Sequence, residues 1–293
     1  MPIAITSSLL FLFAPTSMFL VSFFPLPISG ISQPIRSTPP RAIENKKGEP
    51  PCDRFTEGVL EESDMPEHSM ETCWWVDSGG VFFVENGKGT TLKGILPTEA
   101  VWRLKYAHNN PTDTNVGFRP QNIFRLINRK KWTNVSQEVL FKVKDYDKSP
   151  SQNRNMSNGI LLMSRYVDSD NLYYAGLRVD GTAVIKKKAD GQYVTLATAR
   201  YIESAEYDID ENPLLLPKNK WIGERLVTKN NPDGSVNLKL YINMDDSNKW
   251  RLILDVDDSL ASSGSSPFTT PGNIGIRSDF MDVDFSDFQA KVE

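Results

Sequence analysis

The sequence contains few of the residues on which histidine-based chemistry depends. Histidine occurs only twice in 293 residues, as His68 and His108. His68 precedes the regularly patterned part of the chain, and His108 stands in a turn-like setting before Asn109-Asn110-Pro111. A histidine zinc site and a Ser-His-Asp triad both need histidines held against specific partners, so we expect neither.

An excess of positive charge is also lacking. The 33 Lys and Arg residues are outnumbered by 37 Asp and Glu residues, and the formal net charge is −4. Nonspecific affinity for nucleic acid comes from many Lys and Arg contacts with phosphates. The short run Lys186-Lys187-Lys188 is more typical of a solvated strand edge than of such a surface. We therefore expect no nucleic-acid partner.

Charge is absent from the first 33 residues, and residues 9–24 are mostly Leu, Phe, Val and Met. Such a segment is not part of the fold. The small residues Ser29 and Gly30 after the apolar run favour a signal peptide over residues 1–31. The positive charges lie only beyond the run, which favours an uncleaved membrane anchor instead. Both alternatives predict a secreted or cell-surface protein, and the second adds a membrane tether.

The only cysteines, Cys52 and Cys73, form an even pair about 20 residues apart. We predict a disulfide between them, the alternative being two free thiols. Asn134-Val-Ser136 and Asn155-Met-Ser157 match the glycosylation acceptor pattern, although such patterns also occur by chance. Both features agree with an extracellular location.

The rest of the chain divides at about residue 74. Residues 32–73 are rich in Pro, Glu, Ser and Lys without periodicity, which predicts a flexible linker. Residues 74–293 show short alternating runs between turn residues, which is typical of a β-sandwich or barrel. Asp-Gly pairs at 180–181, 190–191 and 233–234 predict hairpin turns. In the last run Phe288 breaks the alternation, so we expect a bulge near Ser286 or Asp287. The expected strands are 80–85, 102–106, 123–128, 137–145, 159–166, 172–179, 183–188, 193–198, 221–228, 235–243, 250–256, 274–278 and 282–291.

Three blocks of this region resemble a known superfamily. They are Gly159 to Lys188, Lys220-Trp-Ile-Gly223, and Gly275-Ile-Arg-Ser-Asp-Phe-Met-Asp-Val-Asp-Phe285. They are similar to strands of concanavalin A-like lectin and glucanase domains, and most similar to uncharacterised extracellular members with laminin-G-like jelly rolls. The resemblance covers Trp75 to the C-terminus. It implies an all-β jelly-roll sandwich of two curved antiparallel sheets whose concave face binds or processes polysaccharide.

Basic and aromatic residues are the candidates for a glycan site. If the turn at 180–181 leaves a three-residue loop, Tyr174, Arg178 and Lys186 share the open face of the sheet, whereas a two-residue turn places Lys187 there. Arg165 is expected on the same face across the preceding hairpin. Aromatic rings stack on sugars and guanidinium groups pair with carboxylates, so the set suits an acidic glycan. The alternative is an ordinary exposed strand surface.

Two further motifs complete the candidates. Trp74 and Trp75 could form a stacking platform. Asp282-Val-Asp284-Phe-Ser-Asp287 superficially resembles the Glu-x-Asp-x-x-Glu motif of retaining glucanases, but it lacks Glu and lies in the last strand. We therefore expect either a solvated strand face or, for Asp282 and Asp284, oxygen ligands of a structural Ca²⁺. We expect no required cofactor.

The leading hypothesis is an exported carbohydrate-binding protein that recognises a polysaccharide. One alternative is a polysaccharide lyase or glycoside hydrolase of the same fold, in which Arg neutralises a uronic acid and Tyr or Lys removes its C5 proton. A structural or adhesive cell-surface domain is the other. No catalytic residue is assigned.

Overall fold

The computed structural model describes residues 51–245 and 249–293, all within the unit Lys47–Glu293. The segment 1–31, predicted to be a signal peptide or anchor, and residues 32–50 of the predicted linker lie outside the described residues. Within residues 51–245 and 249–293, none of the helices has the length and apolar character that spanning a membrane requires. The elements in chain order are β1 (Gly58–Glu61), η1 (Pro66–His68), β2 (Trp74–Ser78), β3 (Val81–Glu85), β4 (Lys88–Thr91), α1 (Val101–Asn109), η2 (Pro120–Asn122), β5 (Ile123–Trp132), β6 (Val135–Tyr146), β7 (Gly159–Asp168), β8 (Asn171–Arg178), β9 (Thr182–Ala189), β10 (Gln192–Arg200), β11 (Ile222–Asn230), β12 (Val236–Asn243), β13 (Arg251–Asp258), α2 (Leu260–Ser263), β14 (Gly272–Asp279) and β15 (Met281–Val292).

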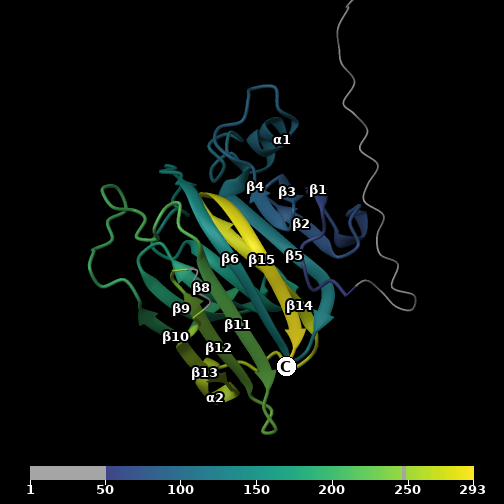
Figure 1. Cartoon of the computed structure of the whole chain (residues 1–293), viewed down its shortest axis with the longest axis vertical. Coiled ribbons are helices and arrows are strands. Elements are labelled where there is room, and N and C mark those ends of the chain that lie inside the picture. Colours follow the sequence, from purple (N-terminus) through teal and green to yellow (C-terminus); the bar gives the residue numbers. More distant parts are fainter. Residues whose placement is uncertain (1–50, 246–248) are drawn as a thin grey trace, which may run out of the picture. The chain divides into compact units, whose positions relative to one another are not determined.

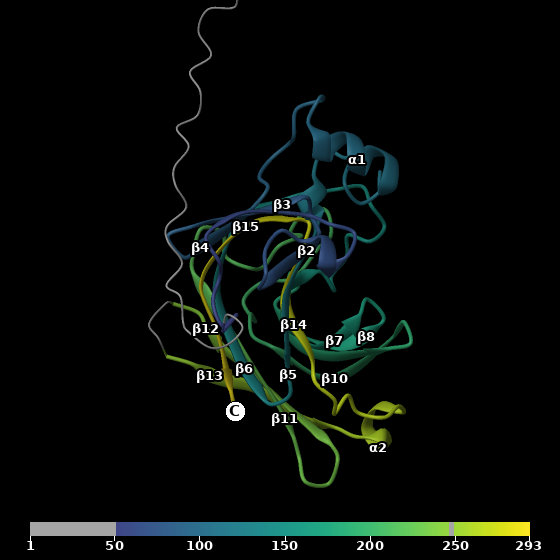
Figure 2. The same ribbon diagram turned by 90° about the vertical axis from the view of Figure 1, so that its right-hand side faces the viewer.

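The strands form two antiparallel sheets (Figure 1). The eight-stranded sheet, called sheet A, has the order β1-β3-β4-β15-β6-β11-β12-β13. The seven-stranded sheet, called sheet B, has the order β10-β9-β8-β7-β14-β5-β2. The two sheets face each other as layers in the view of Figure 2. The expected all-β sandwich of two antiparallel sheets is confirmed.

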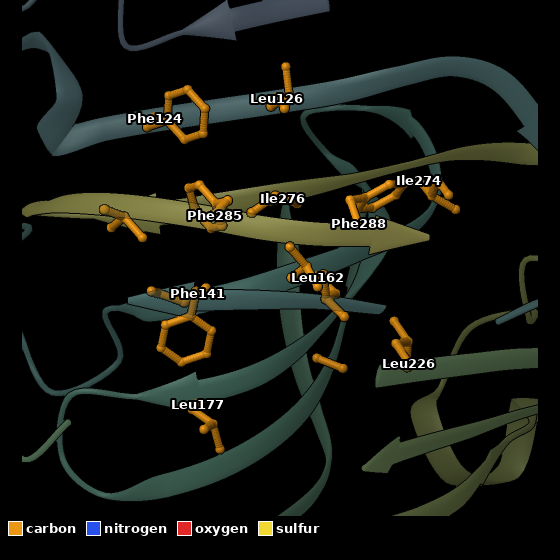
Figure 3. Packing of buried hydrophobic residues seen from close by; sticks show 14 of the residues in the cluster. Phe124, Leu126, Phe141, Leu162, Leu177, Leu226, Ile274, Ile276, Phe285 and Phe288 are labelled. Carbon is orange, nitrogen blue, oxygen red and sulfur yellow. The ribbon is translucent and has the colours of Figure 1, made fainter. Parts of the chain in front are cut away.

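Alternating side chains build the core between the sheets. In β12, Val236, Leu238, Leu240 and Ile242 are buried, while the residues between them are partly exposed. This is the two-residue period of a strand with one packed face. Side chains of both sheets meet in the interior, among them Phe124, Leu126, Phe141, Leu162, Leu177, Leu226, Ile274, Ile276, Phe285 and Phe288 (Figure 3).

Hairpins and a bulge occur where turn chemistry predicted them. The glycines of the three Asp-Gly pairs all have φ between +78° and +85°, a region that glycine enters at little steric cost. In β15 the register with β6 shifts between Ser286 and Gln289, and Asp287 has φ +53°. The expected bulge is therefore present, and it returns Phe288 to the core.

The linker prediction is wrong for its second half. Strand β1 pairs antiparallel with β3 at the edge of sheet A, and Leu60 is buried. Cys52 and Cys73 form the expected disulfide, with their Cα atoms 5.0 Å apart. The composition of this segment is polar, but the few apolar residues that it has pack on the sandwich. The ordered unit therefore begins before residue 74.

The strand expected over 102–106 is instead helix α1. Trp102 and Tyr106 are four residues apart. This spacing places two side chains on one face of a helix and also on one face of a strand, so the pattern fits either element. Tyr106 is the buried residue of the helix, and its hydroxyl accepts a hydrogen bond from the Gly79 N–H at 2.8 Å and donates one to Glu62. Leu104, which a strand would have buried with them, is 53% exposed. The helix ends at Asn109, just before Asn110-Pro111.

Candidate functional site

The candidate site lies on the outer face of sheet B. Residues of β7 alternate between the core, where Ile160 and Leu162 point, and a second buried cluster that contains Leu161 and Met163. Every member of the second cluster belongs to a strand of sheet B. The cluster therefore covers the face of sheet B that is turned away from sheet A, and this face has an apolar floor.

A cavity of about 400 Å³ opens on this face. Its floor is formed by Leu161 and Tyr174, and its sides by Lys186, Tyr193 and Arg277. Apolar floors with a few converging polar groups are typical of small-ligand sites. We call this space the first cavity. It is also lined by Asp113, Ile123, Asn153, Asn155, Ser157, Asn158, Asp279 and Phe280.

The hairpin of β8 and β9 places two of the four predicted glycan residues in the first cavity. Tyr174 is the direct cross-strand partner of Lys186, and Ala175 is that of Ile185. This is the register of the longer turn, so Lys186 faces outward. Lys187 is fully buried on the inner side, where its Nζ lies 2.9 Å from Asp258 Oδ2. The shorter-turn alternative, with Lys187 on the open face, is wrong.

Lys186 has no counter-ion among the described residues within 4.0 Å. Its Nζ lies 5.8 Å from the centre of the Tyr193 ring. Burial lowers the pKa of Lys186, and the positive charges of Arg178 and Arg277 lower it further, while the carboxylates of Asp180 and Asp279 oppose the shift in part. A partly buried ammonium group among other cations is stabilised when an anion binds beside it.

Two residues that the sequence analysis missed shape the first cavity. Arg277 donates to Asp279 Oδ1 at 2.8 Å, and its guanidinium group lies 5.5 Å from the Tyr174 ring centre. The rings of Tyr174 and Tyr193 are stacked with centroids 6.2 Å apart. Burial raises the pKa of Tyr174, with Arg277 opposing the shift, so its hydroxyl remains a hydrogen-bond donor at neutral pH. Arg277 belongs to one of the blocks that carry the family resemblance, which is the signal that could have identified it.

The rim of the first cavity comes from the segment before β7. Asn155 Oδ1 accepts from the Ser157 N–H at 2.9 Å, and Asn158 Oδ1 accepts from the Asn155 N–H at 2.6 Å. Asp113 accepts from Ser151 Oγ at 2.6 Å and Asn153 Nδ2 at 2.9 Å. These bonds hold short amide, hydroxyl and carboxylate groups at the mouth of the cavity. No periodic pattern marks such a segment, and its residues Asn155 and Ser157 were expected only as part of a glycosylation acceptor pattern.

Arg178 lies at the end of β8, and its guanidinium group already has partners within the protein. It forms an ion pair with Asp180 at 2.9 Å and donates from Nε to the Met156 carbonyl at 2.9 Å. It does not line the first cavity. Its charge still acts on Lys186. Arg178 is therefore a neighbour of the site rather than part of its surface.

Arg165 is not on the open face, contrary to the prediction. It has φ +50° where the pairing of β7 with β8 breaks after Ser164. The bulge adds one residue, so Tyr166 rather than Arg165 follows Met163 on the outer face. Arg165 is 1% exposed and donates to Asn230 Oδ1 at 2.7 Å and to the Thr270 carbonyl at 3.0 Å. Its role is to hold the segment before β14.

Asp282 and Asp284 do not fit a calcium site. Asp282 accepts from the Gly94 N–H at 2.7 Å and from Gln121 at 2.9 Å. Asp284 is paired with Lys93 at 2.6 Å. Donors and a cation therefore occupy the oxygens that Ca²⁺ would need. In the described part of the chain no three His, Cys, Asp or Glu side chains are grouped to hold a metal ion.

The acidic motif of residues 282–287 and the first cavity belong to different sheets. Its three aspartates lie on β15 in sheet A, whereas the strands that line the first cavity belong to sheet B. Asp287 lies at the bulge and is exposed. The aspartates of β15 are thus structural or solvated, and no pair of them lines the first cavity.

No protein-family model matches the sequence, and no curated protein matches it. Among solved structures, the carbohydrate-binding module CBM66 from Bacillus subtilis is similar with a TM-score of 0.45 at 14% identity, over 76% of this chain and 97% of that chain. The exoplasmic/lumenal domain of VIP36 in its Ca²⁺/Man2-bound form gives 0.41 at 12%, over 80% and 87%. The GH43 protein BlXynB from Bacillus licheniformis gives 0.40 at 12%, over 82% and 40%. These TM-scores are below 0.5, so the fold description rests on the strand order and register given above.

Proposed function

We propose that the protein binds an acidic carbohydrate in the first cavity, with the anionic group of the sugar beside Lys186. The observation that carries the proposal is the unpaired, half-buried ammonium group of Lys186. Arg178 and Arg277 are each matched by an aspartate two residues further along the chain. Within the residues that the structure describes, Lys186 has no such partner within 4.0 Å, so its ammonium group can pair with a carboxylate or sulfate of a ligand; the Asp113 carboxylate, which lines the same cavity, is not in contact with it.

The other lining groups suit a sugar rather than a simple ion. Tyr174 and Tyr193 offer aromatic surface to the C–H face of a pyranose ring. The amides of Asn153 and Asn155, with the Ser157 hydroxyl, lie at the mouth where sugar hydroxyls would need partners of both polarities. The resemblance of these strands to lectin and glucanase domains supports the same class of ligand. An exported protein would meet such polymers outside the cell.

The test is titration calorimetry with acidic and neutral oligosaccharides of equal length, such as uronic acid and glucose oligomers. We expect binding of the acidic series and a loss of at least about tenfold in affinity in Lys186→Met, because a hydrogen bond to a charged group contributes about 1.5–3 kcal/mol. Lys239→Met is the matched control. Lys239 lies on β12 in the other sheet and is paired with Asp255. Equal affinity of wild type and Lys186→Met would contradict the proposal, as would a preference for the neutral series.

A lyase is the second candidate function, favoured by one observation. The lowered pKa of Lys186 leaves more of its amine neutral, and Tyr174 stands opposite it in the hairpin. A neutral amine is the form that accepts a proton from C5 of a uronic acid; the C4–C5 double bond then forms as the C4–O4 bond breaks, and the departing sugar oxygen takes a proton from the Tyr174 hydroxyl or from water. Ultraviolet absorbance of the unsaturated product distinguishes the two functions. Appearance of this absorbance with wild type but not with Lys186→Met would assign the lyase, and binding without it would assign the binding protein.

A further inference from the structure

A second cavity, of about 370 Å³, opens on the same face of sheet B. The two cavities share strands. Ile123 and Leu161 line the first cavity, whereas Ile127 and Tyr166 of the same strands β5 and β7 line the second. Four residues of extended strand span about 13 Å. The cavities therefore lie one after the other along the direction of these strands, at a separation that a chain of several sugar units can bridge.

Between the two cavities, Gly275 and the buried Met163 form the outer surface of sheet B. Met163 is fully buried there, and a Cβ on Gly275 would lie 2.8 Å from the Met163 methyl group and 2.4 Å from the Leu126 carbonyl oxygen. Only a glycine allows this close approach. Arg125, the cross-strand partner of Arg277, stands beside this floor and is held by Asp77 at 2.7 Å. A ligand that extends from the first cavity to the second would therefore contact an apolar surface and the guanidinium group of Arg125.

The second cavity has the same mixture of groups as the first. Trp75 and Ile127 give it an apolar floor, and Tyr166 adds an aromatic edge. Neither the Tyr166 hydroxyl nor the Lys131 ammonium group is hydrogen-bonded to another residue in the described ranges. Lys131 is exposed at the rim. The unpaired phenol and the unpaired ammonium group above an apolar floor suit a sugar whose negative charge lies beside Lys131, while the carboxylates of Glu67 and Asp168, which line the same cavity, can accept from sugar hydroxyls.

One wall of the second cavity belongs to the disulfide-closed loop. Pro66 and Glu67 of η1 line the cavity and lie between Cys52 and Cys73 in the chain. The loop is fixed to the sheet by a hydrogen bond of 2.9 Å from Trp75 Nε1 to the Ser63 carbonyl. Arg129 donates to a carbonyl of the same loop, that of Glu71, at 2.6 Å. The wall is thus preformed, which reduces the entropy lost when a ligand binds.

We infer that a single acidic polysaccharide chain fills both cavities, so the protein recognises a stretch of several sugar units and not a single sugar. The inference rests on the proposed function of the first cavity. It adds a second subsite, built from Trp75, Tyr166 and Lys131, whose wall depends on the Cys52–Cys73 disulfide.

The experiment is titration of uronic acid oligomers of increasing length into wild type and into the double variant Lys131→Met/Tyr166→Phe. In wild type the affinity is expected to rise at least tenfold from short oligomers, which fill one cavity, to those long enough for both. The double variant should lose this gain and keep the wild-type affinity for the shortest ligand. Lys186→Met should lose affinity at every length.

Two results would overturn the second subsite while leaving the first intact. One is a wild-type affinity that is independent of oligomer length, and the other is a double variant that binds long oligomers as tightly as wild type. Absence of binding by wild type at every length would instead overturn the proposed function, and the subsite with it. The two failures are therefore distinguishable.

Removal of the Cys52–Cys73 disulfide tests the role of the wall independently. Cys52→Ser/Cys73→Ser releases the loop that carries Pro66 and Glu67, and its fold is checked by circular dichroism. We expect a severalfold loss of affinity for long oligomers and none for the shortest. A disulfide-free variant that is folded and retains the full gain with length would contradict the role of the wall.

Discussion

Glu224 allows a quantitative test of the packing between the sheets. Its side chain is fully buried on β11 and faces the opposite sheet, where Oε1 accepts the Leu177 N–H at 2.8 Å. Oε2 has no hydrogen-bond partner in the described structure. Burial raises the pKa of Glu224 well above its usual range, and the single hydrogen bond from Leu177 opposes this only in part. The folded protein therefore holds this proton where the unfolded chain has lost it.

The sign of the pH dependence follows from this difference. Below the pKa of an unfolded-state Glu, about 4.3, both states are protonated and no stability is lost. Above it the unfolded state binds fewer protons, so the free energy of unfolding falls by about 1.4 kcal/mol per pH unit until the folded-state pKa is reached. For a domain of this size that corresponds to about 3–5 °C in Tm per pH unit. Glu224→Gln keeps the acceptor for Leu177 and removes the titration.

The assay is urea unfolding of wild type and Glu224→Gln at a series of pH values from 4 to 7. We expect the two free energies of unfolding to differ least near pH 4. As the pH rises, the free energy of unfolding of the variant should increase relative to that of wild type. Glu99→Gln, at an exposed position, is the control and should follow the wild-type curve. A difference between Glu224→Gln and wild type that stays constant over this range would refute the reasoning, because it would show that the folded state does not retain the proton.

Two further substitutions test residues that the structure moved from the expected site into the interior. Lys187→Met leaves the fully buried Asp258 carboxylate without its cation, and breaking such a pair costs about 3–5 kcal/mol, measurable by urea unfolding. A loss in the free energy of unfolding no larger than that caused by the surface substitution Lys239→Met would contradict this expectation. Arg165→Met should lower the free energy of unfolding by about 2 kcal/mol through loss of its hydrogen bonds, with unchanged affinity of the folded protein for acidic oligosaccharides. Loss of affinity without loss of stability would return Arg165 to the site.

Alternation of apolar residues predicted a β-sandwich or barrel, and the resemblance to lectin and glucanase domains implied its two antiparallel sheets. The alternation was correct in β12 and for the outward direction of Tyr174 in β8, whereas for β9 it left Lys186 and Lys187 as alternatives that the register of the hairpin decides. It failed where an extra residue changes the phase, as at Arg165. It also failed at Trp102 to Tyr106, because spacings of two and four are compatible with a strand and with one face of a helix. Both errors are local, so neither changes the expectation of a β-sandwich or barrel.

The site was only partly predictable because its rim depends on contacts distant in sequence. Arg277 and Tyr193 reach Tyr174 from strands β14 and β10, which no local pattern connects. The Asn-rich segment before β7 has no period at all. Strand order in a sheet decides which faces meet, and the sequence of one chain specifies that order only through the whole fold.

The charge imbalance at Lys186, in contrast, was open to prediction from neighbouring residues alone. On one face of a strand the nearest neighbours along the chain are two residues away. Arg178 has Asp180 at that spacing and Arg277 has Asp279, and both pairs are formed. Lys186 has Val184 and Lys188 there, and its cross-strand partners are Tyr174 and Thr195. None of these positions carries an acid, so Lys186 has no neighbouring carboxylate on its own face of the described sheet, which is why we propose that the ligand supplies one.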